Sequence, residues 1–297
     1  MTSGRTRAAV AFVLLAVAAS TYAMLQSLVV PALGLLQEEL DTDQATITWV
    51  FTGYLLSAAV FTPLFGRLGD AIGKKRTLVG TLLAIALGSL LAALAPTVGW
   101  LVAARVLQGA GGATLPLAFG IIRDEFPERW RTTAVSAIAS LAAVGFGAGM
   151  ALGGPITEAF GLRWLFWLPM VAALVAAAGV ALLVPESAGR ERTRLPLLPA
   201  VLLSATLAAG LLGVSQGSTW GWTTGGALVA LGLVLAAVWV AVELRVRTPL
   251  VDMRMMGTRG SGRRTSCPAP SASASSPASR SSRRSSRHPS RRATGSR

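Results

Sequence analysis

The sequence predicts an all-α integral membrane protein. Hydrophobic residues make up 53% of the 297 residues and charged residues only 13%, whereas a soluble domain carries about a quarter charged residues. Several apolar runs reach the roughly 20 residues that a helix needs to cross a bilayer. The sequence has no segments of about ten residues in which apolar and polar residues alternate, as the strands of a transmembrane barrel require. The backbone inside the lipid must therefore satisfy its hydrogen bonds within helices.

Eight apolar runs are predicted to be membrane helices. The first covers residues 8–36 and is uncharged. It is far longer than the 7–15-residue apolar core of a typical signal peptide, so we interpret it as a helix that enters from the cytoplasm. The other seven lie at about 47–65, 77–94, 101–122, 133–156, 164–184, 197–214 and 225–242.

The distribution of basic residues predicts the topology. Lys and Arg fall at both termini and in the connecting segments 66–76, 123–131 and 185–194. If the chain crosses the membrane at each predicted helix, the other connections lie on the external side, and their only basic residue is Arg163. Since Lys and Arg in short loops are retained on the cytoplasmic side, we expect a multi-pass protein of the plasma (inner) membrane with both termini in the cytoplasm.

The connection between the second and third predicted helices, residues 66–76, contains three glycines, one acid and four bases. Gly66 and Gly73 would let the backbone turn tightly. Asp70 would accept hydrogen bonds at a helix end or pair with an arginine of a neighbouring helix. On physical grounds alone, this connection is a basic turn that sets the topology.

This connection also resembles a known motif. The pattern Gly66-x-x-x-Asp70-x-x-Gly73-Lys74-Lys75-Arg76 is similar to the signature loop between helices 2 and 3 of the major facilitator superfamily. The resemblance implies a transporter whose N-terminal six-helix bundle covers residues 1–184. It also implies that Asp70 and the bases form a cytoplasmic charge network, which locks one face of the transporter and releases it during transport.

Arg105 lies inside the fourth predicted helix. A charge within a crossing costs about 2.5–3.5 kcal/mol on insertion scales, so Arg105 should face the bundle interior and have a partner. Alternatively, it could snorkel to the outer interface. The segment Leu101-x-x-x-Arg105-Val106-x-Gln108-Gly109-x-Gly111-Gly112-Ala113 resembles the helix 4 motif of drug exporters in the superfamily. This resemblance implies that Arg105 assists proton coupling, with Gln108 and Gly109 as parts of the same motif.

The fifth predicted helix carries Gly145, Gly149 and Gly153 at four-residue spacing. Such a stripe predicts close packing against another helix. The segment 145–155, which also includes Gly154 and Pro155, resembles the antiporter motif of drug:proton exporters. The position that aligns with the motif's proline is Met150.

Polar residues inside the crossings are few. Tyr22 and Gln26 on the first predicted helix would either line a substrate cavity or make hydrogen bonds between helices, worth about 0.6 kcal/mol each. No acid lies well inside a predicted crossing, and Glu158 and Glu243 sit at helix edges. The residue that would carry the proton is therefore not identified from the sequence.

Residues 185–256 comprise a short linker and two predicted helices. They resemble the extra helix pair of fourteen-helix drug exporters. The pattern Glu243-x-Arg245-x-Arg247-x-Pro249-Leu250-Val251-Asp252 is similar to the segment that leads from this pair into the C-terminal bundle. Residues 257–297 are rich in Ser, Arg and Pro, and we predict that they are disordered. We interpret them as the product of a frameshift, with a tail that binds nucleic acid or anionic lipid as the alternative.

The function implied by these resemblances is proton-coupled efflux of drugs or other small hydrophobic or cationic compounds. Superfamily transporters rock two bundles around a central site, and this sequence supplies one. Its expected partners are the lipid bilayer, a small-molecule substrate, protons, and either a second copy or a complementing half-transporter. The alternative is a non-transporting fragment or membrane interaction module.

Other function classes are disfavoured. No nucleophile–base pair or metal constellation indicates an enzyme. The single cysteine, Cys267, and the single histidine, His288, leave no cysteine- or histidine-based metal site in the crossings. We therefore expect no metal, no cofactor and no nucleic-acid partner.

Overall fold

The computed structural model describes residues 2–184 and 197–245. Within these ranges every regular element is helical, which confirms the predicted all-α fold. The predicted linker 185–194 and the tail 257–297 lie outside the described residues. The helices are α1 (Thr2–Leu28), η1 (Val30–Ala32), α2 (Leu33–Glu39), α3 (Gln44–Ile72), α4 (Lys74–Ala93), α5 (Val98–Gln108), η2 (Gly109–Ala113), α6 (Thr114–Glu125), α7 (Glu128–Phe160), α8 (Trp164–Leu183), α9 (Leu197–Trp220) and α10 (Trp222–Arg245).

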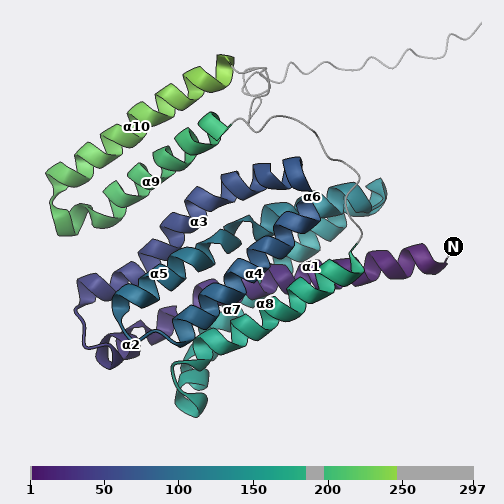
Figure 1. The fold of residues 1–297 in the computed structure, drawn as a ribbon, viewed down its shortest axis with the longest axis horizontal. Helices are drawn as coiled ribbons and strands as arrows, with labels where there is room; N and C mark the ends of the chain where they lie inside the picture. Colours follow the sequence, from purple (N-terminus) through teal and green to yellow (C-terminus); the bar gives the residue numbers. More distant parts are fainter. Residues whose placement is uncertain (1, 185–196, 246–297) are drawn as a thin grey trace, which may run out of the picture. The chain divides into compact units, whose positions relative to one another are not determined.

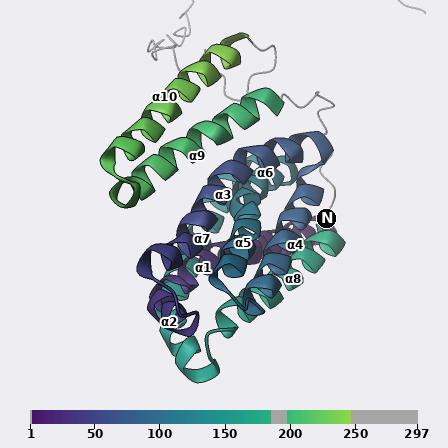
Figure 2. The ribbon, with the colours of Figure 1, turned by 60° about the vertical axis from the view of Figure 1, so that its left-hand side comes forward.

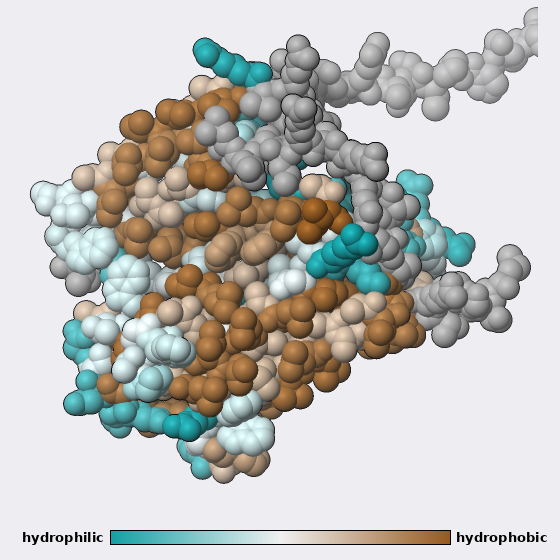
Figure 3. All heavy atoms as spheres, viewed as in Figure 1, coloured by the Kyte–Doolittle hydropathy of each residue, from teal (hydrophilic) through white to brown (hydrophobic). Residues whose placement is uncertain are grey.

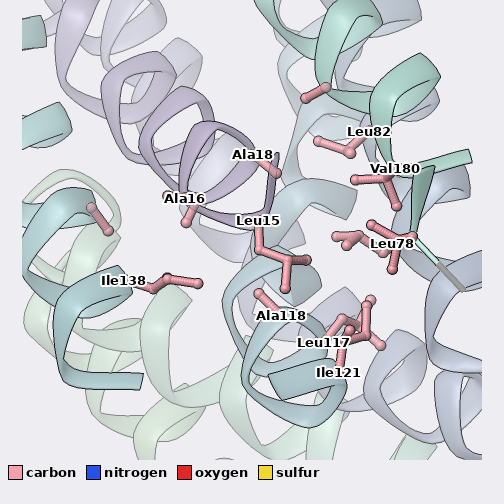
Figure 4. Close-up of a cluster of buried hydrophobic side chains, with 14 of the residues drawn as sticks. Leu15, Ala16, Ala18, Leu78, Leu82, Leu117, Ala118, Ile121, Ile138 and Val180 are labelled. Carbon is pink, nitrogen blue, oxygen red and sulfur yellow. The ribbon is translucent and has the colours of Figure 1, made fainter. Parts of the chain in front are cut away.

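The first six predicted crossings pack into one bundle. Helix α1 contacts both α7 and α8, while α4 contacts α8 and α5 (Figures 1 and 2). Leucine, isoleucine, valine and alanine side chains from α1, α4, α6, α7 and α8 meet in a buried cluster (Figure 4). Its fully buried members include Leu15, Leu82 and Ile138. This cluster joins the five helices that contribute to it.

The helices are suited to a membrane. Seven of the described helices are long and apolar enough to cross a bilayer. On the face shown in Figure 3, apolar residues cover the middle of the helices and hydrophilic residues gather towards their ends. The chain is therefore a multi-pass membrane protein.

Two crossings predicted as single helices are interrupted. The predicted helix 8–36 ends at Leu28 and continues through η1, which contains Pro31, into α2. Proline removes a backbone donor and crowds the preceding turn. The predicted helix 101–122 is divided into α5, the 3₁₀ segment η2 and α6. Here the glycines of η2 weaken the α-helical ladder, because glycine loses the most backbone freedom on folding.

Two predicted loops are in fact helical. The prediction that residues 66–76 form a loop with a tight turn at Gly66 is wrong, because α3 continues to Ile72 and α4 begins at Lys74. The turn is made by Gly73 alone, at φ 114°. Likewise, the polar loop predicted at 216–224 is reduced to Gly221, at φ 91°, between α9 and α10. A single glycine at positive φ reverses the chain without steric cost, so each helix can extend to the turn.

The pair α9–α10 packs tightly and contacts α3. A Cβ atom added to Gly225 would lie 2.7 Å from the Cα of Gly217, so the two helices approach at backbone distance. The Ser204 hydroxyl donates a 2.9 Å hydrogen bond to the Val60 carbonyl of α3. Further along the interface, the hydroxyls of Thr52 and Ser215 are 3.5 Å apart. Helix α9 therefore runs antiparallel to α3.

This antiparallel register can be tested by crosslinking. With Cys267 changed to serine to remove the native thiol, we expect Thr52→Cys combined with Ser215→Cys to form a disulfide on mild oxidation, because their hydroxyls meet in the structure. Thr52→Cys combined with Ser204→Cys is the matched control, since Ser204 contacts α3 near Val60 instead. Gel mobility before and after reduction reports the bond. Equal crosslinking of both pairs would contradict the register.

Candidate functional site around Arg105 and the charged end of α3

Arg105 lies in the last turn of α5 and is 0% exposed. Its Nη1 donates a 2.8 Å hydrogen bond to the Gln108 Oε1, and its Nε donates to the Val50 carbonyl at 3.4 Å. The Gln108 Nε2 in turn donates to the Ser89 hydroxyl at 2.9 Å. The side chain therefore points into the bundle, and polar groups of α3, α4 and α5 surround it.

Aromatic rings complete the surroundings of the guanidinium. The Arg105 Cζ lies 4.9 Å from the centroid of the Tyr54 ring and 5.9 Å from that of Phe166. A cation over an aromatic face is attracted by the ring quadrupole, and more strongly where water is excluded. The Arg105 Nη2 makes no hydrogen bond within the described ranges 2–184 and 197–245. One guanidinium nitrogen thus remains available inside the bundle.

Glycines let the helices around Arg105 approach one another. A Cβ atom on Gly109 would overlap the Ser57 hydroxyl of α3. One on Gly111 would lie 2.5 Å from the Ile85 Cδ1 of α4. One on Gly88 of α4 would lie 2.7 Å from the Gln108 Cγ, so Gly88 makes room for that side chain. Gly109 and Gly111 thus bring α3 and α4 close to the segment after Arg105, and Gly88 leaves room for the Gln108 side chain.

The polar residues predicted on the first crossing lie in the C-terminal half of α1 and are at least half-buried. The half-buried Tyr22 ring is 6.4 Å from the Tyr54 ring, so it lies beside the ring that contacts Arg105. Gln26, one turn further along α1, is also half-buried. The neighbouring Ser27 donates a 2.6 Å hydrogen bond to the Phe146 carbonyl of α7, which is an interhelical contact.

A second polar centre lies where α3 meets α4. The Lys74 Nζ forms a 2.8 Å ion pair with the Asp124 Oδ2 of α6. A Cβ atom on Gly120 would lie 2.8 Å from the Lys74 Cδ, so Gly120 makes space for the lysine stem. The half-buried Asp70 lines a cleft of about 510 Å³ together with Gly66, Lys74 and Arg123. Of the other predicted bases, Lys75 is half-buried and Arg76 exposed.

The glycine stripe of α7 lies against α1. Gly145, Gly149 and Gly153 are buried, and added Cβ atoms would lie 2.6–2.7 Å from the carbonyl oxygens of Ser20, Met24 and Leu28. An added Cβ on Gly154 would have no atom within 4 Å, and Pro155 and Met150 are exposed. Close packing in this segment therefore depends on the stripe at four-residue spacing.

Several residues of these two centres were not singled out from the sequence. Tyr54, Ser89 and Phe166 lie in three apolar runs other than the one that contains Arg105. The only sequence signal that could have identified them as its neighbours is a polar or aromatic side chain within an apolar run. Asp124 lies in a mixed-charge segment, which gave no sign of its partner. Glu243, predicted at a helix edge, is 2% exposed in the last turn of α10.

Comparison with known proteins identifies the family that the chain matches. The profile of the family described as Major Facilitator Superfamily matches residues 15–204. A multidrug resistance protein B homolog of Mycobacterium tuberculosis is 35% identical over 228 residues, covering 74% of this chain and 42% of that protein. The methylenomycin A resistance protein of Streptomyces coelicolor is 35% identical, covering 76% and 48%. The cephamycin export protein CmcT of Amycolatopsis lactamdurans is 35% identical, covering 80% and 50%. The chain thus spans half or less of these relatives.

A solved structure shows the same fold. The human organic anion transporter MFSD10 (TETRAN) matches with a TM-score of 0.50 and 19% sequence identity. The match covers 70% of this chain and 55% of that one. At this identity, the likeness concerns the arrangement of helices alone.

Two glycines of α7 provide a test of the packing against α1. Gly149→Ala should destabilise the protein by about 1–3 kcal/mol, because the new Cβ would overlap the α1 backbone. Gly147→Ala is the matched control, since its Cβ would meet no atom within 4 Å. It should be neutral or stabilising, as alanine favours helix more than glycine does. Thermal unfolding in detergent measures both, and equal melting temperatures would contradict the packing.

The Lys74–Asp124 ion pair can be measured by a double-mutant cycle. The two side chains are 19% and 23% exposed, so we expect Lys74→Gln and Asp124→Asn to be non-additive by about 0.5–1 kcal/mol. Lys75→Gln combined with Asp124→Asn is the control pair and should be additive. The free energy of unfolding of each variant gives the coupling. Full additivity for Lys74 and Asp124 would show that the ion pair does not stabilise the fold.

Proposed function

Because the chain belongs to the major facilitator superfamily, we propose that it forms the N-terminal bundle and following helix pair of a fourteen-helix, proton-coupled exporter. The proposed substrates are drugs or other small hydrophobic or cationic compounds. The names of its relatives support this substrate class, since they include a multidrug resistance protein homolog and an export protein for a cephamycin. The proposed location is the plasma (inner) membrane, with both termini in the cytoplasm.

The observation that carries the proposal is the buried guanidinium of Arg105. Its Nη1 and Nε bond to Gln108 and Val50, whereas its Nη2 has no hydrogen-bond partner among the described residues. A cation in a medium of low dielectric favours the ionised form of a nearby carboxyl group. Arg105 would therefore make a carboxyl group that comes beside it during transport release its proton, which is the step that coupling requires.

The charged end of α3 supports a gating role. The Lys74–Asp124 ion pair joins α4 to α6, and Asp70 lines the adjoining cleft. Contacts of this kind can close one face of the bundle in one state and open in another. We propose that Asp70, Lys74, Lys75 and Arg76 form this gate, with Asp124 as the partner of Lys74.

A complete cavity requires a second bundle. Transporters of this kind alternate access by rocking two repeats around a site near the bilayer midplane. The described residues provide one such bundle together with the pair α9–α10. We propose that the second comes from a complementing half-transporter or from another copy of this chain.

Accumulation of ethidium, a hydrophobic cation, tests this function in cells. We expect the chain to lower ethidium accumulation when it is co-expressed with the C-terminal half of the Mycobacterium tuberculosis multidrug resistance protein B homolog. Arg105→Ala should return accumulation to the empty-vector level, as should a protonophore. Arg163→Ala is the matched control, because Arg163 is exposed at the turn before α8.

The outcomes separate the alternatives. Arg105-dependent export by the chain alone would indicate that two copies assemble a working cavity. Equal accumulation in every combination, with each protein present in the membrane, would contradict the transport proposal. That result would favour a non-transporting membrane fragment or interaction module.

A further inference from the structure

A groove of about 650 Å³ opens between the N-terminal half of α1 and the first three turns of α7. Its volume is within the range of roughly 300–1,000 Å³ that small-molecule sites occupy. Phe12 and Val13 of α1 and Ala137 of α7 line its apolar part. The groove is separate from the surroundings of Arg105 and from the cleft beside Asp70.

The groove lies just beyond the glycine stripe that joins the two helices. Gly145 is the stripe's nearest member, and its bare backbone lies against Ser20 of α1. Towards the start of α7, the same four-residue spacing continues with Leu141, Ala137 and Thr133. The Ser20 hydroxyl still donates a 3.1 Å hydrogen bond to the Leu141 carbonyl. Ala137 and Thr133, nearer the start of α7, line the groove instead. The groove therefore lies between the N-terminal half of α1 and the first three turns of α7.

The polar residues at the groove carry both signs of charge. Glu125, the last residue of α6, and Arg129, in the first turn of α7, both line it. The neighbouring Asp124 is directed instead to its ion pair with Lys74. Trp130 also lines the groove and is 52% exposed. Tryptophan favours the level of lipid headgroups, which indicates that these charges lie at the membrane interface.

These features match a lipid with a zwitterionic headgroup. We propose that the groove binds one molecule of phosphatidylethanolamine. Its phosphate would pair with Arg129, its ammonium would donate hydrogen bonds to Glu125, and an acyl chain would lie along Phe12 and Ala137. Phosphatidylglycerol has no cation for Glu125. The quaternary ammonium of phosphatidylcholine has no N–H to donate.

Lipid retention by the purified, delipidated full chain tests this proposal. The protein is incubated separately with dioleoyl phosphatidylethanolamine, phosphatidylglycerol and phosphatidylcholine, and bound lipid is counted by native mass spectrometry. We expect phosphatidylethanolamine to bind about tenfold more tightly than either other lipid, because one charge-assisted hydrogen bond is lost in each alternative. Arg129→Gln should lower its affinity by about the same factor. Glu125→Gln should remove the preference over phosphatidylglycerol.

A groove-filling variant completes the test. Ala137→Phe should abolish retention, whereas Val144→Phe, at a position of α7 that is 66% exposed, should not change it. Equal binding of the three lipids, or stronger binding of phosphatidylglycerol, would overturn the proposal. Unchanged binding by a folded Ala137→Phe protein would do the same. If Ala137→Phe fails to fold, lipid binding by Arg129→Gln decides the test, because this residue is exposed. Unchanged binding by Arg129→Gln would also overturn the proposal.

Discussion

A guanidinium buried within a membrane bundle constrains every helix around it. An unpaired charge in the bilayer interior is costly, and Arg105 is fully buried. The cost is offset by the Val50 carbonyl, the Gln108 amide and the rings of Tyr54 and Phe166. These groups belong to α3, α5 and α8, and Ser89 of α4 holds Gln108 in turn. Loss of the register between any two of these helices would separate the charge from part of its surroundings.

Glycine makes this arrangement possible. Between helices in lipid, association depends on close packing and hydrogen bonds rather than on burial from water. In η2, the absence of side chains lets α3 approach Gly109 and α4 approach Gly111. In α7, the absence of a side chain at Gly149 lets the α1 backbone approach. The same glycines in η2 interrupt the helix that carries Arg105. The close approach and the interruption thus have one cause.

Much of the fold follows from the sequence, because long apolar runs in lipid have few alternatives to the helix. The orientation of the α7 stripe also follows, since four-residue spacing places glycines on one helix face. Helix ends were less predictable. Polarity marks where a run leaves the membrane, but it does not show that α3 continues to Ile72. The partners of Arg105 and Lys74 depend on tertiary packing, so Tyr54 and Asp124 could not be assigned from local pattern.

Helix α3 connects the two polar centres of this protein. Its carbonyl at Val50 and its ring at Tyr54 contact Arg105, while Asp70 lines the cleft near its other end. Its Val60 carbonyl accepts the hydrogen bond from Ser204 of α9. Pro63 lies inside α3, between Tyr54 and Asp70. Proline removes one backbone hydrogen bond and crowds the carbonyl four residues earlier, so bending of α3 would concentrate there. This point lies between the part of α3 that contacts Arg105 and the part that carries Asp70, so a bend there would change the angle between the two polar centres.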